Sequence, residues 1–131
     1  MSEPLGLNRR AGERLVASGD QPMAPVRHVV VFRPKPSVSA DLIAQITDAF
    51  HELKNTVPGI VSFEDGVNNS PEGKNHGFTH VFLVTFEDER ARDAYLEHPD
   101  HHRFSQLLRQ LNVLDDMFVV DYVPSWFANV Y

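Results

Sequence analysis

The chain of 131 residues contains no cysteine, and this absence excludes several kinds of site. Disulfides, thiolate nucleophiles, iron–sulfur clusters and cysteine-based zinc sites all depend on that side chain. Basic residues are also scarce, because 12 lysines and arginines stand against 18 aspartates and glutamates, which gives a net charge of −6. Proteins that bind nucleic-acid phosphates or anionic membranes need the opposite balance. We therefore expect neither nucleic acid nor a membrane as a partner.

Long apolar runs are missing too, since no stretch approaches the roughly 20 residues that a membrane span needs. The segment 1–25 lacks the apolar core of a signal peptide, so the expected location is cytoplasmic. Its glycines, prolines and scattered apolar residues predict an N-terminal extension that is mobile or packs on a partner subunit. The remaining composition, 42% hydrophobic and 23% charged, is typical of one globular domain. Residues 125–131 are expected to form a short C-terminal tail.

Hydrophobic patterns between these ends predict a regular order of strands and helices. Runs of β-branched and aromatic residues predict strands over 26–33, 60–67, 78–86 and 117–123. Apolar residues at helical spacing predict helices over 42–57 and 88–111, the second interrupted at His98 and Pro99. The order β-α-β-β-α-β indicates an α+β domain of the ferredoxin-like kind, with an antiparallel sheet.

Such a sheet has helices on one face only, and its other face needs a cover. Val29, Val31, Val81 and Leu83 would give the strands apolar residues on the helix-free face as well. An apolar surface of that size is unfavourable in water. We therefore predict a homodimer in which two copies pack sheet against sheet.

Two histidines in the predicted strands are candidates for a site. His28 and His80 each share a strand face with apolar neighbours, and pairing of their strands would bring the two rings near each other. Two interpretations stay open. The rings are core histidines with hydrogen-bond partners, or they form the polar corner of a small-molecule pocket.

A second group of candidates surrounds the helix interruption. His98 either caps the following helix or faces a ligand. His101 lies in the first turn, where the helix dipole disfavours imidazolium, so its ring is expected to stay neutral and able to accept a proton. Tyr95 either fills the core or donates its hydroxyl to a substrate oxygen. No HExxH or similar spacing is present, and we expect neither a metal nor another cofactor.

Several separated motifs resemble one known family in the right order. They are RHVVVF at 27–32, PGI at 58–60, NSPEGKNHGFTH at 69–80, VTFED at 84–88, YLEHPDH at 95–101 and VVDY at 119–122. Over 26–124 the chain resembles the stress-responsive dimeric α/β-barrel (Dabb) domain. The resemblance implies two ferredoxin-like subunits whose sheets close into a barrel.

The same resemblance suggests roles for particular residues. One family member is a polyketide cyclase that closes a ring by an aldol reaction without a metal. Its Tyr-x-x-His-Pro-x-His run is matched by Tyr95, His98 and His101, and its strand histidines by His28 and His80. Carried over, His101 becomes the base and Tyr95 its assistant.

We therefore expect a pocket between sheet and helices that binds a small, partly apolar carbonyl compound. Its predicted ligand-binding residues are His28, Phe32, Ile46, Phe50, His80, Phe82 and His98, beside the catalytic pair Tyr95 and His101. The first hypothesis is a cofactor-independent enzyme of the cyclase or lyase type. The second is a non-enzymatic stress-response or ligand-carrier protein with structural histidines, and a weaker third is a cofactor-independent monooxygenase. An open cavity of ~300 Å³ or more around His101 favours the first hypothesis over the second.

Overall fold

The computed structural model describes residues 24–128. Most of the predicted extension 1–25 and the last three residues of the tail lie outside this range. The elements, in chain order, are β1 (Val26–Pro34), α1 (Ala40–Thr56), β2 (Ile60–Val67), β3 (His80–Phe86), α2 (Glu89–Glu97), α3 (Pro99–Leu111), β4 (Leu114–Tyr122) and α4 (Ser125–Ala128). The predicted βαββαβ order is confirmed, and α4 adds one short turn of helix to the tail.

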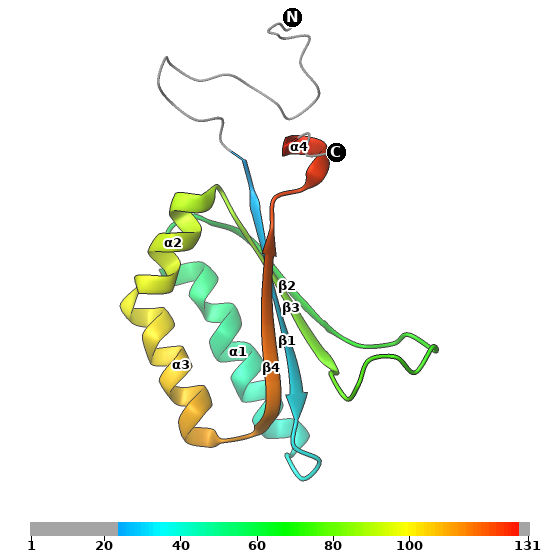
Figure 1. Ribbon diagram of the computed structural model, residues 1–131. Helices are drawn as coiled ribbons and strands as arrows, with labels where there is room; N and C mark the ends of the chain where they lie inside the picture. The colour runs from blue at the N-terminus through cyan, green and yellow to red at the C-terminus, as the bar shows by residue number, and fades with distance from the viewer. Residues whose placement is uncertain (1–23, 129–131) are drawn as a thin grey trace, which may run out of the picture.

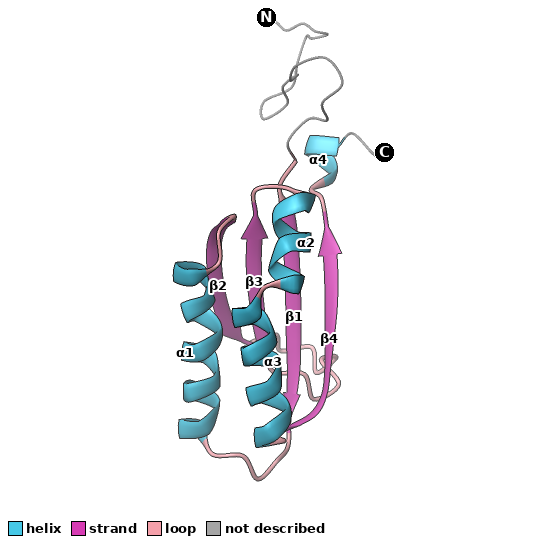
Figure 2. Cartoon of the chain, turned by 90° about the vertical axis from the view of Figure 1, so that its left-hand side faces the viewer, coloured by secondary structure: helices cyan, strands magenta, loops and turns pink. Residues whose placement is uncertain are grey.

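The four strands form one antiparallel sheet in the order β2-β3-β1-β4. Helices α1, α2 and α3 all lie on one side of this sheet, as Figure 1 shows. Viewed from the helix side in Figure 2, α1 and α3 run side by side, whereas the edge strand β4 has no helix in front of it. This asymmetry leaves one edge of the helix-covered face open.

Local sequence signals explain where the helices begin and end. The Ser39 hydroxyl accepts a hydrogen bond from the Leu42 amide and starts α1, and the Asp88 carboxylate does the same for the Ala91 amide at the start of α2. Pro99 occupies the first position of α3, where its missing N–H costs no hydrogen bond. The break between α2 and α3 therefore falls where the sequence predicts it.

The core lies between the helices and the sheet and is built on aromatic rings. The Phe82 ring centroid is 4.8 Å from that of Phe32 and 4.9 Å from that of Phe50. Val84 and Phe86 continue this layer along β3 and are fully buried. Each such side chain contributes on the order of 2 kcal/mol by leaving water.

The third strand was predicted to begin at Phe78 and to run over 78–86, and its predicted start is wrong. The strand begins at His80, and Phe78 does not share the face of the residues that follow it. Its ring instead packs edge-on against Phe118, 5.0 Å between centroids, on the helix-free side of the sheet. His76 and Gly77 both have positive φ (52° and 80°), so the chain turns sharply before Phe78 and the strand alternation is interrupted.

The helix-free face of the sheet is apolar, as predicted. Phe118 and Val120 from β4 are 43% and 52% exposed there, and they pair with Val31 and Val29 of β1. Val81 continues the same patch on β3. Within the described part of the chain, no helix has the length and apolar character to cross a membrane.

Candidate functional site

A cavity of about 380 Å³ lies on the helix side of the sheet, between α3 and strands β1 and β4. Its outer wall includes Met117 and Val119, which stay partly exposed because no helix covers β4 (Figure 2). Most of the lining is apolar, with a few polar groups, which is the usual character of small-molecule sites. The lining residues are His28, Val30, Phe32, Phe50, Tyr95, Leu96, His101, Phe104, Ser105, Leu108, Arg109, Met117 and Val119.

His28 is almost fully buried and is held by a carboxylate. Its Nδ1 lies 2.7 Å from Oδ1 of Asp121, the residue directly opposite on β4. An ionised carboxylate can only accept, so Nδ1 donates this hydrogen bond. In the neutral ring Nε2 therefore carries the lone pair, and this fixes the tautomer of His28.

Arg92 from α2 holds the other oxygen of the same carboxylate. Its Nη1 donates to Oδ2 of Asp121 over 2.9 Å, and its Nε donates to Oδ1 of Asp93 over 2.7 Å. These hydrogen bonds, to Asp93 first and then to Asp121, raise the pKa of Arg92 and keep it charged. The Asp121 carboxylate is thus fixed from two sides, between a guanidinium and an imidazole.

Sequence reasoning did not single out Asp121 or Arg92. The available signal was that Asp121 is an acidic residue within the otherwise apolar stretch 117–122 of β4. A carboxylate at such a position needs a hydrogen-bonding partner, and His28 on the neighbouring strand provides one.

Tyr95, at the end of α2, stands between the two histidines. Its ring centroid is 5.7 Å from that of His28 and 4.4 Å from that of His101. Burial raises the pKa of Tyr95, and the negative charge of Asp121 raises it further, so the hydroxyl remains a donor at neutral pH. Within residues 24–128 this hydroxyl makes no hydrogen bond, although the side chain is 99% buried.

His101 faces the cavity from the first turn of α3. Burial lowers the pKa of His101, and the nearby His102 and His28 lower it further, against the opposing effect of its hydrogen bond to the Leu96 carbonyl. The predicted direction is confirmed, but burial rather than the helix dipole is its main cause. Nδ1 donates to the Leu96 oxygen over 3.3 Å, which leaves Nε2 as the acceptor in a neutral ring.

Four predicted ligand-binding residues, Ile46, His80, Phe82 and His98, are not part of this cavity. Ile46 and Phe82 are 99% buried in the core behind it. His80 pairs with Phe32 at the opposite end of β1 from His28 and lines a separate hollow. The two histidines that were expected to meet are therefore offset by four strand positions, about 13 Å along β1. The reason is strand register, which places Val84 opposite His28.

His98 also lies outside the cavity lining, and it serves as a helix cap. Its Nδ1 accepts a hydrogen bond from the Asp100 amide over 3.0 Å at the start of α3. This is one of the two interpretations left open by the sequence. Among the described residues, no group of three or more histidines and carboxylates is arranged to hold a metal ion.

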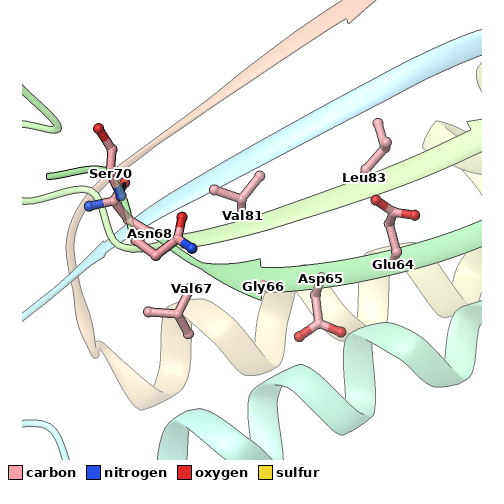
Figure 3. A pocket seen from close by; sticks show the side chains of 9 residues that line it. Glu64, Asp65, Gly66, Val67, Asn68, Ser70, Val81 and Leu83 are labelled. Atoms are coloured by element: carbon pink, nitrogen blue, oxygen red, sulfur yellow. Dashed lines mark hydrogen bonds between the residues drawn. The ribbon is translucent and has the colours of Figure 1, made fainter. Parts of the chain in front are cut away.

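A second hollow of about 370 Å³ lies at the end of β2 (Figure 3). Glu64 extends to the same side as Val81 and Leu83, and Asp65 extends to the opposite side. The hollow contains neither histidine nor tyrosine, and part of its wall belongs to the apolar, helix-free face. Its residues do not include any of the predicted site.

The fold and the cavity together define a ferredoxin-like α+β domain with a histidine-edged hollow beneath α3. A family model described as the stress responsive A/B barrel domain (Dabb) matches residues 26–124. The chain therefore belongs to the stress-responsive A/B barrel family, as its motifs indicated.

Two curated plant proteins are similar to this chain. The stress-response A/B barrel domain-containing protein HS1 of Arabidopsis thaliana is 32% identical over 106 residues, which cover 81% of this chain and 95% of that protein. Olivetolic acid cyclase of Cannabis sativa is 25% identical over 99 residues, 76% of this chain and 96% of that enzyme.

Two solved structures extend the comparison. Hydroxynitrile lyase from Passiflora edulis superimposes with a TM-score of 0.70 at 26% identity, covering 78% of this chain and 94% of the lyase. A dimeric ferredoxin-like protein of unknown function from Jannaschia superimposes with a TM-score of 0.64 at 32% identity, covering 75% of this chain and 97% of that protein.

Proposed function

We propose that this protein is a cofactor-independent enzyme that removes a proton next to a carbonyl group of a small, partly apolar compound. One observation carries the proposal. A neutral imidazole, His101, lies beside the buried ring of Tyr95 at the polar end of an open cavity, and the Tyr95 hydroxyl makes no hydrogen bond within residues 24–128. Two similar proteins are enzymes by name, a cyclase and a lyase, which supports an enzymatic role.

In the proposed step, Nε2 of His101 takes the proton from the carbon next to the carbonyl. The electron pair of that C–H bond becomes the C=C bond of an enolate, while the carbonyl π pair moves onto oxygen. The Tyr95 hydroxyl donates a hydrogen bond to that oxygen as its charge develops. His28, fixed by Asp121, offers a second polar contact at the same end. The enolate then adds to another carbonyl or expels a leaving group, according to the substrate.

Solvent deuterium exchange tests this step without knowledge of the natural substrate. A linear β-diketone in D₂O, followed by NMR, reports the loss of its α-protons. We expect the protein to accelerate exchange and His101→Ala to reduce that acceleration by about 100-fold or more, the usual contribution of a general base. An exposed histidine on another helix provides the control, because His51→Ala changes the same residue type outside the cavity and His51 is not among the groups that shift the pKa of His101.

The result also separates the two main hypotheses. No acceleration, or equal acceleration by the wild type and His101→Ala, would reject the enzymatic proposal. Binding of the diketone in the cavity without exchange would favour a ligand carrier with structural histidines instead.

We further propose that the functional unit is a homodimer whose two sheets pack face to face and close into an α/β barrel. The exposed apolar residues of the helix-free face, Phe118 and Val120 among them, support this arrangement. A similar solved protein is described as dimeric, in agreement with it. Sedimentation velocity at micromolar concentration tests the proposal, and a mass of 14.8 kDa for the particle would contradict it.

A further inference from the structure

We propose that Arg109 anchors an anionic group of the ligand, so that the substrate is an elongated carboxylate with its reacting carbonyl at the opposite end. This inference rests on the proposed function, because it places the carbonyl beside His101. Both residues line the same cavity and belong to the same helix. Eight residues separate them, which corresponds to about 12 Å along the axis of α3.

The opposite wall of the cavity has a similar length. It runs along β1 from His28 to Phe32, four strand residues or about 13 Å. Val30 lies between them, and Val119 pairs with Val30 from β4, so the middle of this wall is apolar. The cavity is therefore polar at the His28 end and apolar along its length, with a cation on the helix that forms its other side.

The charge of Arg109 has no protein partner in the described part of the chain. Three of the other five arginines there do have carboxylate partners: Arg33 with Asp116, Arg92 with Asp121 and Arg103 with Asp100. Arg27 and Arg90 have none there, but neither of them lines this cavity. In a chain with a net charge of −6, a guanidinium left unpaired at the wall of an apolar cavity is available to an anion from outside. A carboxylate matches its planar, forked set of donors.

A neutral ligand would fill the apolar middle of the cavity but leave this cation to water. An acid whose aliphatic chain spans the distance satisfies both ends at once. The structural alternative is that Arg109 only stabilises the last turn of α3 by interacting with the helix dipole. In that case its replacement would change stability slightly and ligand preference not at all.

Calorimetric titration with two matched probes distinguishes these cases. The probes are a linear β-diketone with a terminal carboxylate on a medium-length chain and the methyl ester of the same compound. For the wild type we expect the acid to bind about fivefold more tightly than the ester, a modest factor because Arg109 is solvent-exposed. Arg109→Gln should remove this difference, and Arg109→Lys should restore part of it.

Arg103→Gln is the matched control. It removes the same charge from the same helix, outside this cavity. Equal affinity for acid and ester in the wild type would overturn the inference, as would an equal loss of preference in Arg103→Gln.

A preference for the acid that depends on Arg109, without any proton exchange, would support the anion site and reject the enzymatic proposal. Proton exchange that depends on His101, but is the same for acid and ester and is unchanged in Arg109→Gln, would support the enzymatic proposal and reject the anion site. Failure of both probes to bind would reject both.

Discussion

Replacing Asp121 by alanine should destabilise the fold through the buried ring of His28. The variant leaves the Nδ1–H of a ring that is only 4% exposed without its acceptor, which costs about 1–3 kcal/mol. It also removes the partly exposed hydrogen bond from Arg92, worth about 0.5–1 kcal/mol. Together these terms lower the free energy of unfolding by roughly 2–4 kcal/mol.

Thermal unfolding followed by circular dichroism measures this loss. For a domain of this size, about 4 °C of Tm accompanies each kcal/mol, so Asp121→Ala should unfold roughly 8–16 °C below the wild type. The comparison needs a fixed protein concentration, because dissociation of a dimer would make Tm depend on it. Asp121→Asn retains a carbonyl oxygen that can accept from Nδ1, and its loss should be smaller.

The control for this prediction is Asp93→Ala. Asp93 also bonds to Arg92 but is 69% exposed at its side chain, and no hydrogen bond joins it to His28 within the described residues. Its removal should change the free energy of unfolding by less than about 0.5 kcal/mol. If Asp121→Ala were no more destabilised than Asp93→Ala, the hydrogen bond to His28 would not have the importance assigned to it. Nitrogen-15 NMR gives an independent readout of the His28 tautomer. In the wild type the proton of the neutral ring should be on Nδ1, and in Asp121→Ala this tautomer should no longer be favoured.

Four further outcomes follow from the same geometry. Tyr95→Phe should slow diketone exchange by about tenfold or more, while its stability in urea changes by less than about 1 kcal/mol because no hydrogen bond within the described residues is lost. In an NMR titration, the His101 ring should have a midpoint below pH 6.5. Since the unfolded chain then binds this proton at a higher pH than the folded protein does, the free energy of unfolding should fall as the pH drops below 6.5. His101→Gln should lack this part of the fall when unfolding in urea is measured at several pH values. Val120→Asp should sediment as a monomer, because a charge on the helix-free face opposes sheet packing. His98→Ala should lose about 1 kcal/mol in urea, while His98→Asn, which keeps a capping group, should lose less.

The elements were predictable because local chemistry determines them. Strand β1 is a β-branched run after Pro25, and α1 and α2 start at side chains that cap them, Ser39 and Asp88. The lowered pKa of His101 was predicted in direction from its position early in a helix, but its main cause is burial, which the sequence does not show. Phe78 was misplaced because two consecutive residues of positive φ precede it, and only a glycine signals such a turn in advance.

The site itself was predictable only in part, because it depends on register and on side-chain reach. Strand pairing put Asp121 rather than His80 beside His28, and a sequence read one strand at a time does not reveal that offset. Arg92 reaches Asp121 from a different layer of the fold, so no spacing along the chain relates the two. Ile46 and Phe82 were correctly expected on the helix-covered side, but packing closed the core around them.

The pairing of His28 with Asp121 joins the first and last strands of the described sheet, 93 positions apart. During synthesis the N-terminal strand emerges early, yet its histidine stays without this carboxylate until the C-terminal strand has left the ribosome. Contacts between strands so far apart in the sequence generally slow folding, because the entropy of closing the loop is lost before the contact forms. The cavity is therefore incomplete in the nascent chain. A product truncated before β4 would lack the outer wall of the cavity and the carboxylate that orients the His28 ring.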